Sequence, residues 1–131
     1  MALPHADLLD VISLAPLGEA LKESVSTSLI KTQRVQLLHL VLRAHEDLPQ
    51  HHVADECVVH CLEGCVEVVY PGGVRQLVAN QAVVLPAQQA HALRARTDAA
   101  VLLTLLLQGG DASGKGGGGH ALEREDSSIG M

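Results

Sequence analysis

Two stretches decide the fold of this chain: PQHHVADECVVHCLEG at residues 49–64 and VVLPAQQAHAL at residues 83–93. The first contains a histidine pair, an acidic pair and a β-branched run that ends at Glu63-Gly64, a tight-turn signal. The second contains a short apolar run, a turn that begins at Pro86, and then His91. Both stretches therefore place histidines beside strand candidates, at two well separated points of the chain.

Short β-rich runs separated by turn residues extend from about Ser26 to Leu107. No helix of ordinary length fits between them, and short strands at this spacing are typical of an antiparallel sandwich or barrel. Residues 46–49 are interpreted as a turn that closes the first of these strands. The strand candidates are Val35–Leu42, Cys57–Leu62, Cys65–Tyr70, Val74–Val78, Ala82–Leu85, His91–Ala95 and Ala100–Leu107.

Strict alternation along a strand places residues two apart on the same face. Cys57 and Cys61 therefore share one face, and His60 lies on the other. We expect Cys61 to lie in the core, and His60 to face outward or toward another subunit.

The two ends of the chain differ from this middle part. Leu17–Val25 has only a weak helical period, interrupted by a glycine, so the first residues are interpreted as an arm. The last residues are rich in glycine and cannot bury enough apolar surface to offset their backbone entropy. We predict an N-terminal arm at 1–25, one β-barrel domain at 26–108 and a flexible tail at 109–131.

The composition restricts the classes of partner. The 131 residues carry a net charge of −6 without a basic cluster, which argues against nucleic acids and membrane surfaces. Phe and Trp are absent and Tyr70 is the only aromatic residue, so the core must be aliphatic and the usual stacking surfaces are missing. No signal-peptide pattern opens the chain, no apolar run approaches the roughly 20 residues of a membrane span, and the three cysteines are an odd number. We expect a cytoplasmic protein with reduced thiols.

Together the two stretches resemble the two motifs of the cupin superfamily. In the first motif of that family, two histidines one residue apart are followed by three or four residues, a Glu, six residues and a Gly. With Gly64 as the anchor, the Glu position falls on Cys57, and Glu56 lies one residue away. A three-residue gap assigns a family histidine to His51 and a four-residue gap assigns it to His52, so one of the two histidines is missing.

The second motif of the family has a Gly, a Pro-x-Gly turn and a His. Here His91 follows Pro86 by five residues and matches the motif's histidine. Asn80 stands at the position of the first glycine, and Gln88 stands at the last position of the turn. The resemblance covers about Val35–Leu107, and it retains His91 but departs from the family pattern at both glycines.

The chain is also similar to small single-domain bacterial cupins of the conserved-barrel type, which have an N-terminal arm, a His-x-Val segment and a strand closed by Cys-Leu-Glu-Gly. The resemblance implies an all-β jelly-roll barrel with an internal pocket. Small cupins of this kind are often dimers, and the runs Leu37–Leu42 and Val101–Leu107 are apolar on both faces. We therefore expect a homodimer in which the arm or an outer strand crosses to the partner.

The same similarity favours His51 over His52, and favours Glu56 as the acidic residue that reaches the pocket. The candidate metal site is thus His51, Glu56 and His91. The resemblance implies one divalent Fe, Mn, Ni or Zn there, since nitrogen and oxygen ligands suit such ions. Cys57 is the alternative third ligand, whose thiolate would favour Zn²⁺ or Fe²⁺, although a buried inert thiol is the commoner state of a cysteine. The alternative role for the histidines is that of hydrogen-bonded loop residues.

Two classes of function compete. In the first, the barrel pocket binds a small organic molecule and no chemistry is performed. In the second, His51, Glu56 and His91 serve a metal-dependent enzyme of the dioxygenase or isomerase class. The incomplete ligand set favours the first class, and a purely structural or interaction module is the weakest alternative. The sequence does not identify the ligand, nor does it show whether a reaction is catalysed.

Overall fold

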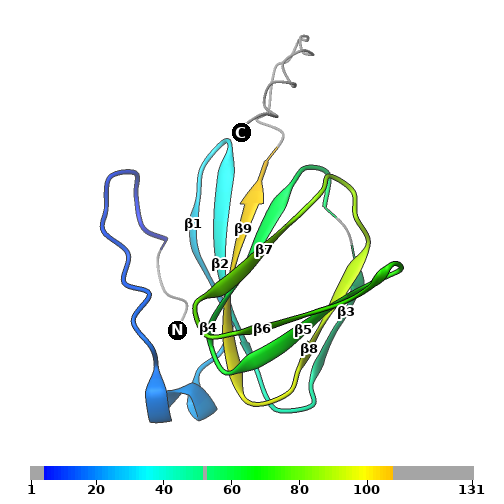
Figure 1. The fold of residues 1–131 in the computed structure, drawn as a ribbon. Coiled ribbons are helices and arrows are strands. Elements are labelled where there is room, and N and C mark those ends of the chain that lie inside the picture. Colours follow the sequence, from blue (N-terminus) through cyan, green and yellow to red (C-terminus); the bar gives the residue numbers. More distant parts are fainter. Residues whose placement is uncertain (1–4, 52, 108–131) are drawn as a thin grey trace, which may run out of the picture.

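The computed structural model describes residues 5–51 and 53–107, with only the backbone of His51 (Figure 1). No helix in this part of the chain is long and apolar enough to cross a membrane. The described residues form one 3₁₀ helix, η1 (Gly18–Glu23), and nine strands. The strands are β1 (Thr27–Lys31), β2 (Val35–Leu42), β3 (Asp47–His51), β4 (Cys57–Glu63), β5 (Cys65–Tyr70), β6 (Gly73–Val78), β7 (Gln81–Leu85), β8 (His91–Ala95) and β9 (Ala99–Leu106).

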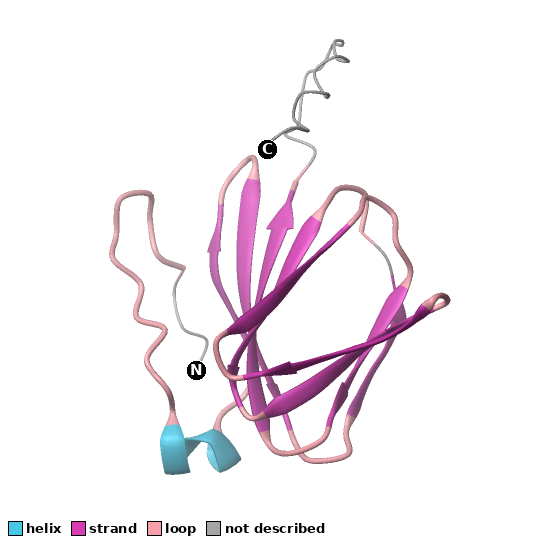
Figure 2. Cartoon of the chain, viewed as in Figure 1, coloured by secondary structure: helices cyan, strands magenta, loops and turns pink. Residues whose placement is uncertain are grey.

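The nine strands form two antiparallel sheets that face each other (Figures 1 and 2). The five-stranded sheet has the order β1-β2-β9-β4-β7, and the four-stranded sheet has the order β3-β8-β5-β6. Neighbours that are distant in sequence, such as β2 and β9, make the arrangement a jelly roll rather than a simple meander. The predicted all-β jelly-roll class is confirmed.

The core lies between the two sheets and is aliphatic, as the composition predicts. Along β4, Cys57, Val59 and Cys61 are buried while the residues between them are partly exposed. This period of two is what a strand with one buried face requires. The prediction that Cys61 lies in the core is confirmed, and His60 projects from the opposite face of the strand.

The interpretation of residues 46–49 as a turn is wrong, because Asp47 to Pro49 belong to β3. A proline cannot donate to a ladder, and it is tolerated on edge strands and at bulges. Both conditions hold here: β3 is the edge strand of its sheet, and its pairing with β8 shifts register between Leu48 and His51. The sequence analysis also leaves β1 without a strand assignment.

The N-terminal segment packs on the outside of the five-stranded sheet. Leu21 of η1 is buried against Val41 and Ala100, which face away from the core between the sheets. The carboxylate of Glu63 accepts hydrogen bonds from the backbone N–H groups of Leu17 (2.8 Å) and Gly18 (2.9 Å). The segment that precedes β1 is therefore held by both apolar and polar contacts. The predicted tail, residues 109–131, lies outside the described residues.

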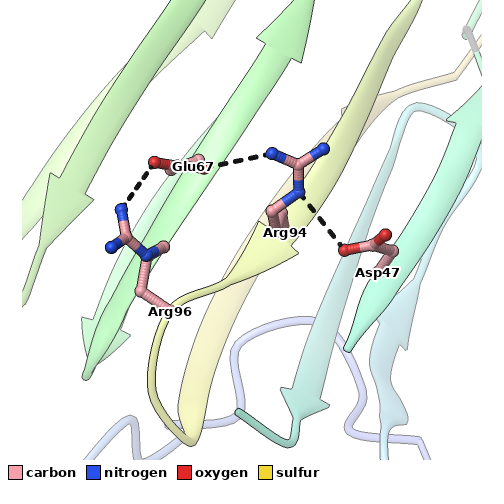
Figure 3. Close-up of polar contacts among 4 residues, drawn as sticks. All are labelled: Asp47, Glu67, Arg94 and Arg96. Carbon is pink, nitrogen blue, oxygen red and sulfur yellow. Dashed lines mark hydrogen bonds and ion pairs between the residues drawn. The ribbon is translucent and has the colours of Figure 1, made fainter. Parts of the chain in front are cut away.

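The outer face of the four-stranded sheet carries an ion-pair network (Figure 3). Arg94 on β8 lies between Asp47 on β3 (3.5 Å) and Glu67 on β5 (3.6 Å), and Arg96 binds the second oxygen of Glu67 at 2.9 Å. Three of these four side chains are more than half exposed, so the network contributes little to stability and marks this face as solvated.

Candidate functional site

His91 is the buried polar residue at the centre of the candidate site. It opens β8 on the face that also carries Leu93 and Ala95, and its exposed fraction is 1%. Its Nδ1 lies 3.0 Å from the carbonyl oxygen of Gln89. Because a carbonyl oxygen only accepts, Nδ1 must carry the proton, and in the neutral ring Nε2 holds the lone pair. The local structure thus fixes one tautomer of His91.

The loop that precedes β8 determines where this imidazole lies. The N–H of Gln89 donates to the carbonyl oxygen of Pro86 (3.2 Å), which closes a turn. The N–H of Gln88 donates to the carbonyl oxygen of Val53 (2.9 Å), which ties the second motif stretch to the first. Gln88 reaches this position with a φ of 63°.

The glycine positions of the family pattern have kept their backbone conformation. Gly64 has a φ of 80°, and a side chain there would collide with the carbonyl oxygen of Asp98. Asn80 and Gln88, which replace the other two glycines, have φ values of 72° and 63°. Such left-handed conformations are uncommon for residues other than glycine. All three motif positions therefore have the turn geometry expected of glycine, whichever residue occupies them.

The backbone of His51 is the register partner of His91. The two residues pair across the antiparallel ladder between β3 and β8, just past the register shift that follows Leu48. The fold thus brings together the two backbone positions that the sequence analysis selects from separate motifs.

A cavity of about 430 Å³ lies between the inner faces of the two sheets, and its lining includes Gln50, the residue before His51. His91 does not itself line this cavity. Two lining residues connect the cavity to the pair: Gln50 precedes His51 on β3, and the carbonyl oxygen of Val53 accepts a hydrogen bond from the loop before β8. The volume lies within the usual range of ligand pockets. The lining residues are Leu38, Leu40, Leu48, Pro49, Gln50, Val53, Leu103 and Leu105.

The residues that line the cavity are not predicted as pocket residues from the sequence. The apolar runs of β2 and β9 are recognisable in the sequence, and alternation would assign Leu38, Leu40, Leu103 and Leu105 to one face. Alternation does not reveal whether that face meets the opposite sheet or leaves a space.

Glu56 and Cys57 are placed differently from each other. Glu56 precedes β4 and is exposed, and its backbone N–H donates to Oδ1 of Asp55 (2.8 Å). Cys57 is buried in the core, where desolvation raises the pKa of its thiol. Burial likewise raises the pKa of Cys61 to about 11. Both core cysteines are therefore neutral thiols near pH 7 and not the thiolates that bind metals.

The described side chains do not fit a three-ligand metal site. Among them, no three His, Cys, Asp or Glu residues gather closely enough to hold an ion, and this set does not include the side chain of His51. The exposed Glu56 and the neutral thiol of Cys57 agree with that result. The ligand set His51, Glu56 and His91 stays a prediction, and no chemical step is derived through a metal.

A second, smaller cavity of about 220 Å³ lies near the other end of the same loop. Its wall includes Pro86 and Gln89 of the loop, and Tyr70 with Arg75, whose guanidinium carbon lies 5.3 Å from the centre of the Tyr70 ring. This arrangement is a cation–π contact. The only aromatic residue of the chain is thus engaged on this side and does not line the larger cavity.

Comparisons with known proteins identify the fold. A cupin superfamily protein from Desulfitobacterium hafniense superposes with a TM-score of 0.66 at 19% identity, over 79% of this chain and 100% of its own. An RmlC-like cupin from Desulfovibrio desulfuricans gives a TM-score of 0.58 at 23% identity, over 79% of this chain and 96% of its own. A conserved protein of unknown function from Streptococcus pyogenes gives a TM-score of 0.62 at 19% identity, over 82% of this chain and 95% of its own.

No family model matches the sequence, and no curated protein matches it either. The structural likeness nevertheless covers most of this chain and nearly all of each of these three proteins, and it agrees with the sheet order and the motif turns. The chain has the fold of a small cupin-domain protein, and the predicted resemblance to cupins is confirmed at the level of the fold.

Proposed function

We propose that this chain binds a small molecule inside the barrel, beside His91. The observation that carries the proposal is a buried imidazole with a fixed tautomer, together with a cavity of about 430 Å³ that is connected to it through Gln50 and Val53. An apolar pocket with a few convergent polar groups is the usual form of a small-molecule site.

The chemistry of His91 supports a recognition role. A buried histidine that donates through Nδ1 to the backbone has one defined acceptor at Nε2 in the neutral ring, and a donor there in the charged ring. The position of His51 opposite it in the ladder makes His51 the second proposed contact. Both roles require no metal.

The test is a binding screen of the full chain against a panel of sugars, dicarboxylates, aromatic acids and aliphatic acids, read by ligand-observed NMR. We expect a hit that is lost in the double variant His51→Ala/His91→Ala. The variant His60→Ala is the matched control, because His60 lies on the outer face of β4. A panel without hits, or a hit that survives the double substitution, would contradict the proposal.

The alternative function is a metal-dependent enzyme that uses His51, Glu56 and His91. One observation favours it: histidines that ligate metals commonly donate their other ring nitrogen to a carbonyl oxygen, as His91 does to Gln89. Elemental analysis of protein purified without a His tag tests this alternative. About one Fe, Mn, Ni or Zn per chain would establish it, and a metal-free protein whose melting temperature is unchanged by chelator would reject it.

We also propose that two copies pair through the outer face of the five-stranded sheet. Register places Leu37, Thr104, Val58 and Val84 in one row across that face, and His39, Leu102, His60 and Ala82 in the next. Neither row contains a Lys, Arg, Asp or Glu, whereas the outer face of the other sheet carries the network of Figure 3. An uncharged face of this kind is suited to a second copy of itself.

Light scattering at tens of micromolar tests the pairing, with Val58→Asp as the disruptive variant. A monomeric wild-type protein would contradict the proposed pairing.

The proposed location is the cytoplasm, where the three free cysteines would stay reduced.

A further inference from the structure

The wall of the larger cavity is almost entirely aliphatic. Leucines from β2 and β9 form one side, and Leu48, Pro49 and Val53 form the other. Gln50 is the one polar side chain among the eight described lining residues. Among the lining residues that the structure describes, none is charged and none carries an aromatic ring.

This wall discriminates between classes of ligand. The hydroxyl groups of a sugar would lose their hydrogen bonds to water and find no partners among the leucines, so burial would be unfavourable. An aromatic ring would find no ring to stack on among the described lining residues. A hydrocarbon chain, in contrast, gains from every methylene that it moves from water into such a cavity.

The polar lining residue, Gln50, lies on β3 next to the position that pairs with His91. Gln50 immediately precedes His51, the register partner of His91, and Val53 is bonded to the loop before His91. The described wall is therefore aliphatic except at Gln50, which marks the part of the cavity nearest to the register pair of His51 and His91. A ligand that matches both parts has one apolar chain and one polar head.

We propose that the natural ligand is an aliphatic amphiphile, with a saturated chain in the leucine-lined cavity and a single carboxylate, amide or hydroxyl head toward Gln50 and His91. The inference rests on the proposed function and adds the class of ligand. A cavity of about 430 Å³ has room for about ten non-hydrogen atoms, since a water molecule takes about 30 Å³ in the liquid and ligands do not fill a cavity completely. A medium-length chain fits this limit.

The first experiment measures the affinity of the full chain for butanoate, hexanoate, octanoate and octanol by calorimetry, with glucose and phenylacetate as comparisons. We expect the affinity to rise about three- to fourfold per methylene until the cavity is filled. Glucose and phenylacetate should bind at least tenfold more weakly than octanoate.

The second experiment uses two neighbouring residues of β9 that point to opposite faces. Leu105→Phe places a ring in the cavity and should weaken octanoate binding at least tenfold, while Leu106→Phe is the matched control on the exposed outer face and should leave it within twofold. Leu40→Phe fills the cavity from β2 and serves if Leu105→Phe does not fold.

The outcomes separate this inference from the proposed function. If glucose or phenylacetate binds in a way that requires His91 and the alkanoates do not bind, the ligand class is wrong and the proposed function stands. If the affinity does not rise with the length of the alkanoate chain, or still rises with it in both cavity-filling variants, the inference is overturned. If none of the probes and no member of the screening panel binds, both are wrong.

Discussion

The N–H of Gln88 donates to the carbonyl oxygen of Val53, and this bond joins the two motif stretches at the edge of the candidate site. Gln88 makes this hydrogen bond from a left-handed conformation, and it stands at a position where the cupin pattern has glycine. The cost of that conformation for a residue with a Cβ atom is about 1–2 kcal/mol. The turn is therefore held in a strained geometry, and His91 is positioned three residues later.

Gln88→Gly should stabilise the protein. The exposed side chain contributes little packing, and the relief of strain should exceed the added entropy of the unfolded chain, for a net gain of about 0.5–1 kcal/mol. Urea unfolding measures the change. The control is Gln89→Gly, which removes a side chain from a residue without positive φ and should destabilise the protein. Equal losses in both variants would show that Gln88 is not strained.

Gly64→Ala should have the opposite effect. The residue has a φ of 80° and its missing Cβ would meet the backbone of Asp98, which cannot move aside as a flexible side chain would. We expect a loss of roughly 2–4 kcal/mol in the free energy of unfolding. Gly72→Ala is the control, because the added Cβ there meets only the side chain of Tyr70. A loss at Gly64 no larger than that at Gly72 would contradict the turn geometry.

Glu63→Ala should loosen the N-terminal segment. The carboxylate accepts from two backbone N–H groups, those of Leu17 and Gly18, and its loss should cost about 1–3 kcal/mol. Limited proteolysis should then cleave the segment before β1 faster than in the wild type. Glu19→Ala, an exposed residue of η1, is the control. Unchanged cleavage in Glu63→Ala would show that the segment is held by its apolar contacts alone.

Stability should fall in mild acid, in part because of His39. Desolvation lowers the pKa of this imidazole, and the nearby Glu63 opposes the shift only in part. Because the folded pKa lies below the unfolded value of about 6.5, the unfolded state binds the proton first. The stability contributed by neutral His39 is therefore complete above that value and is lost as the pH falls below it.

His39→Gln should flatten this dependence. Urea unfolding between pH 8 and pH 5 measures how the free energy of unfolding depends on pH in the wild type and the variant. Above pH 7 the two proteins should show the same dependence, which is the internal control. An equally steep decline of both proteins below pH 6.5 would contradict the role of His39.

Much of the fold is predictable from the sequence. The strands Val35–Leu42, Cys65–Tyr70 and His91–Ala95 have the predicted bounds, because runs of β-branched and aliphatic residues ended by clear turn signals leave little choice. The strand that contains Pro49 is missed, since only its place at the edge of a sheet makes a proline tolerable there.

The candidate site is predictable only in part. The two motifs predict that His51 and His91 come together in the fold. The structure places their backbones opposite each other in the ladder between β3 and β8. The cavity beside them depends on how far Leu38 and Leu105 stand from the facing sheet, and local periodicity does not contain that distance. The exposure of Glu56 depends likewise on the path of the chain between β3 and β4.

The proposed ligand site places His91 beside a small molecule inside the barrel. Long-range ¹H–¹⁵N spectra of the histidine rings test it most directly, with the His91 signals assigned from the variant His91→Gln. We expect His91 to carry its proton on Nδ1 in the free protein, and we expect its Nε2 signal to move on addition of octanoate while the signals of His60 stay fixed. A His91 ring protonated only on Nε2, or one whose signals stay fixed while octanoate binds, would show that His91 does not contact the ligand.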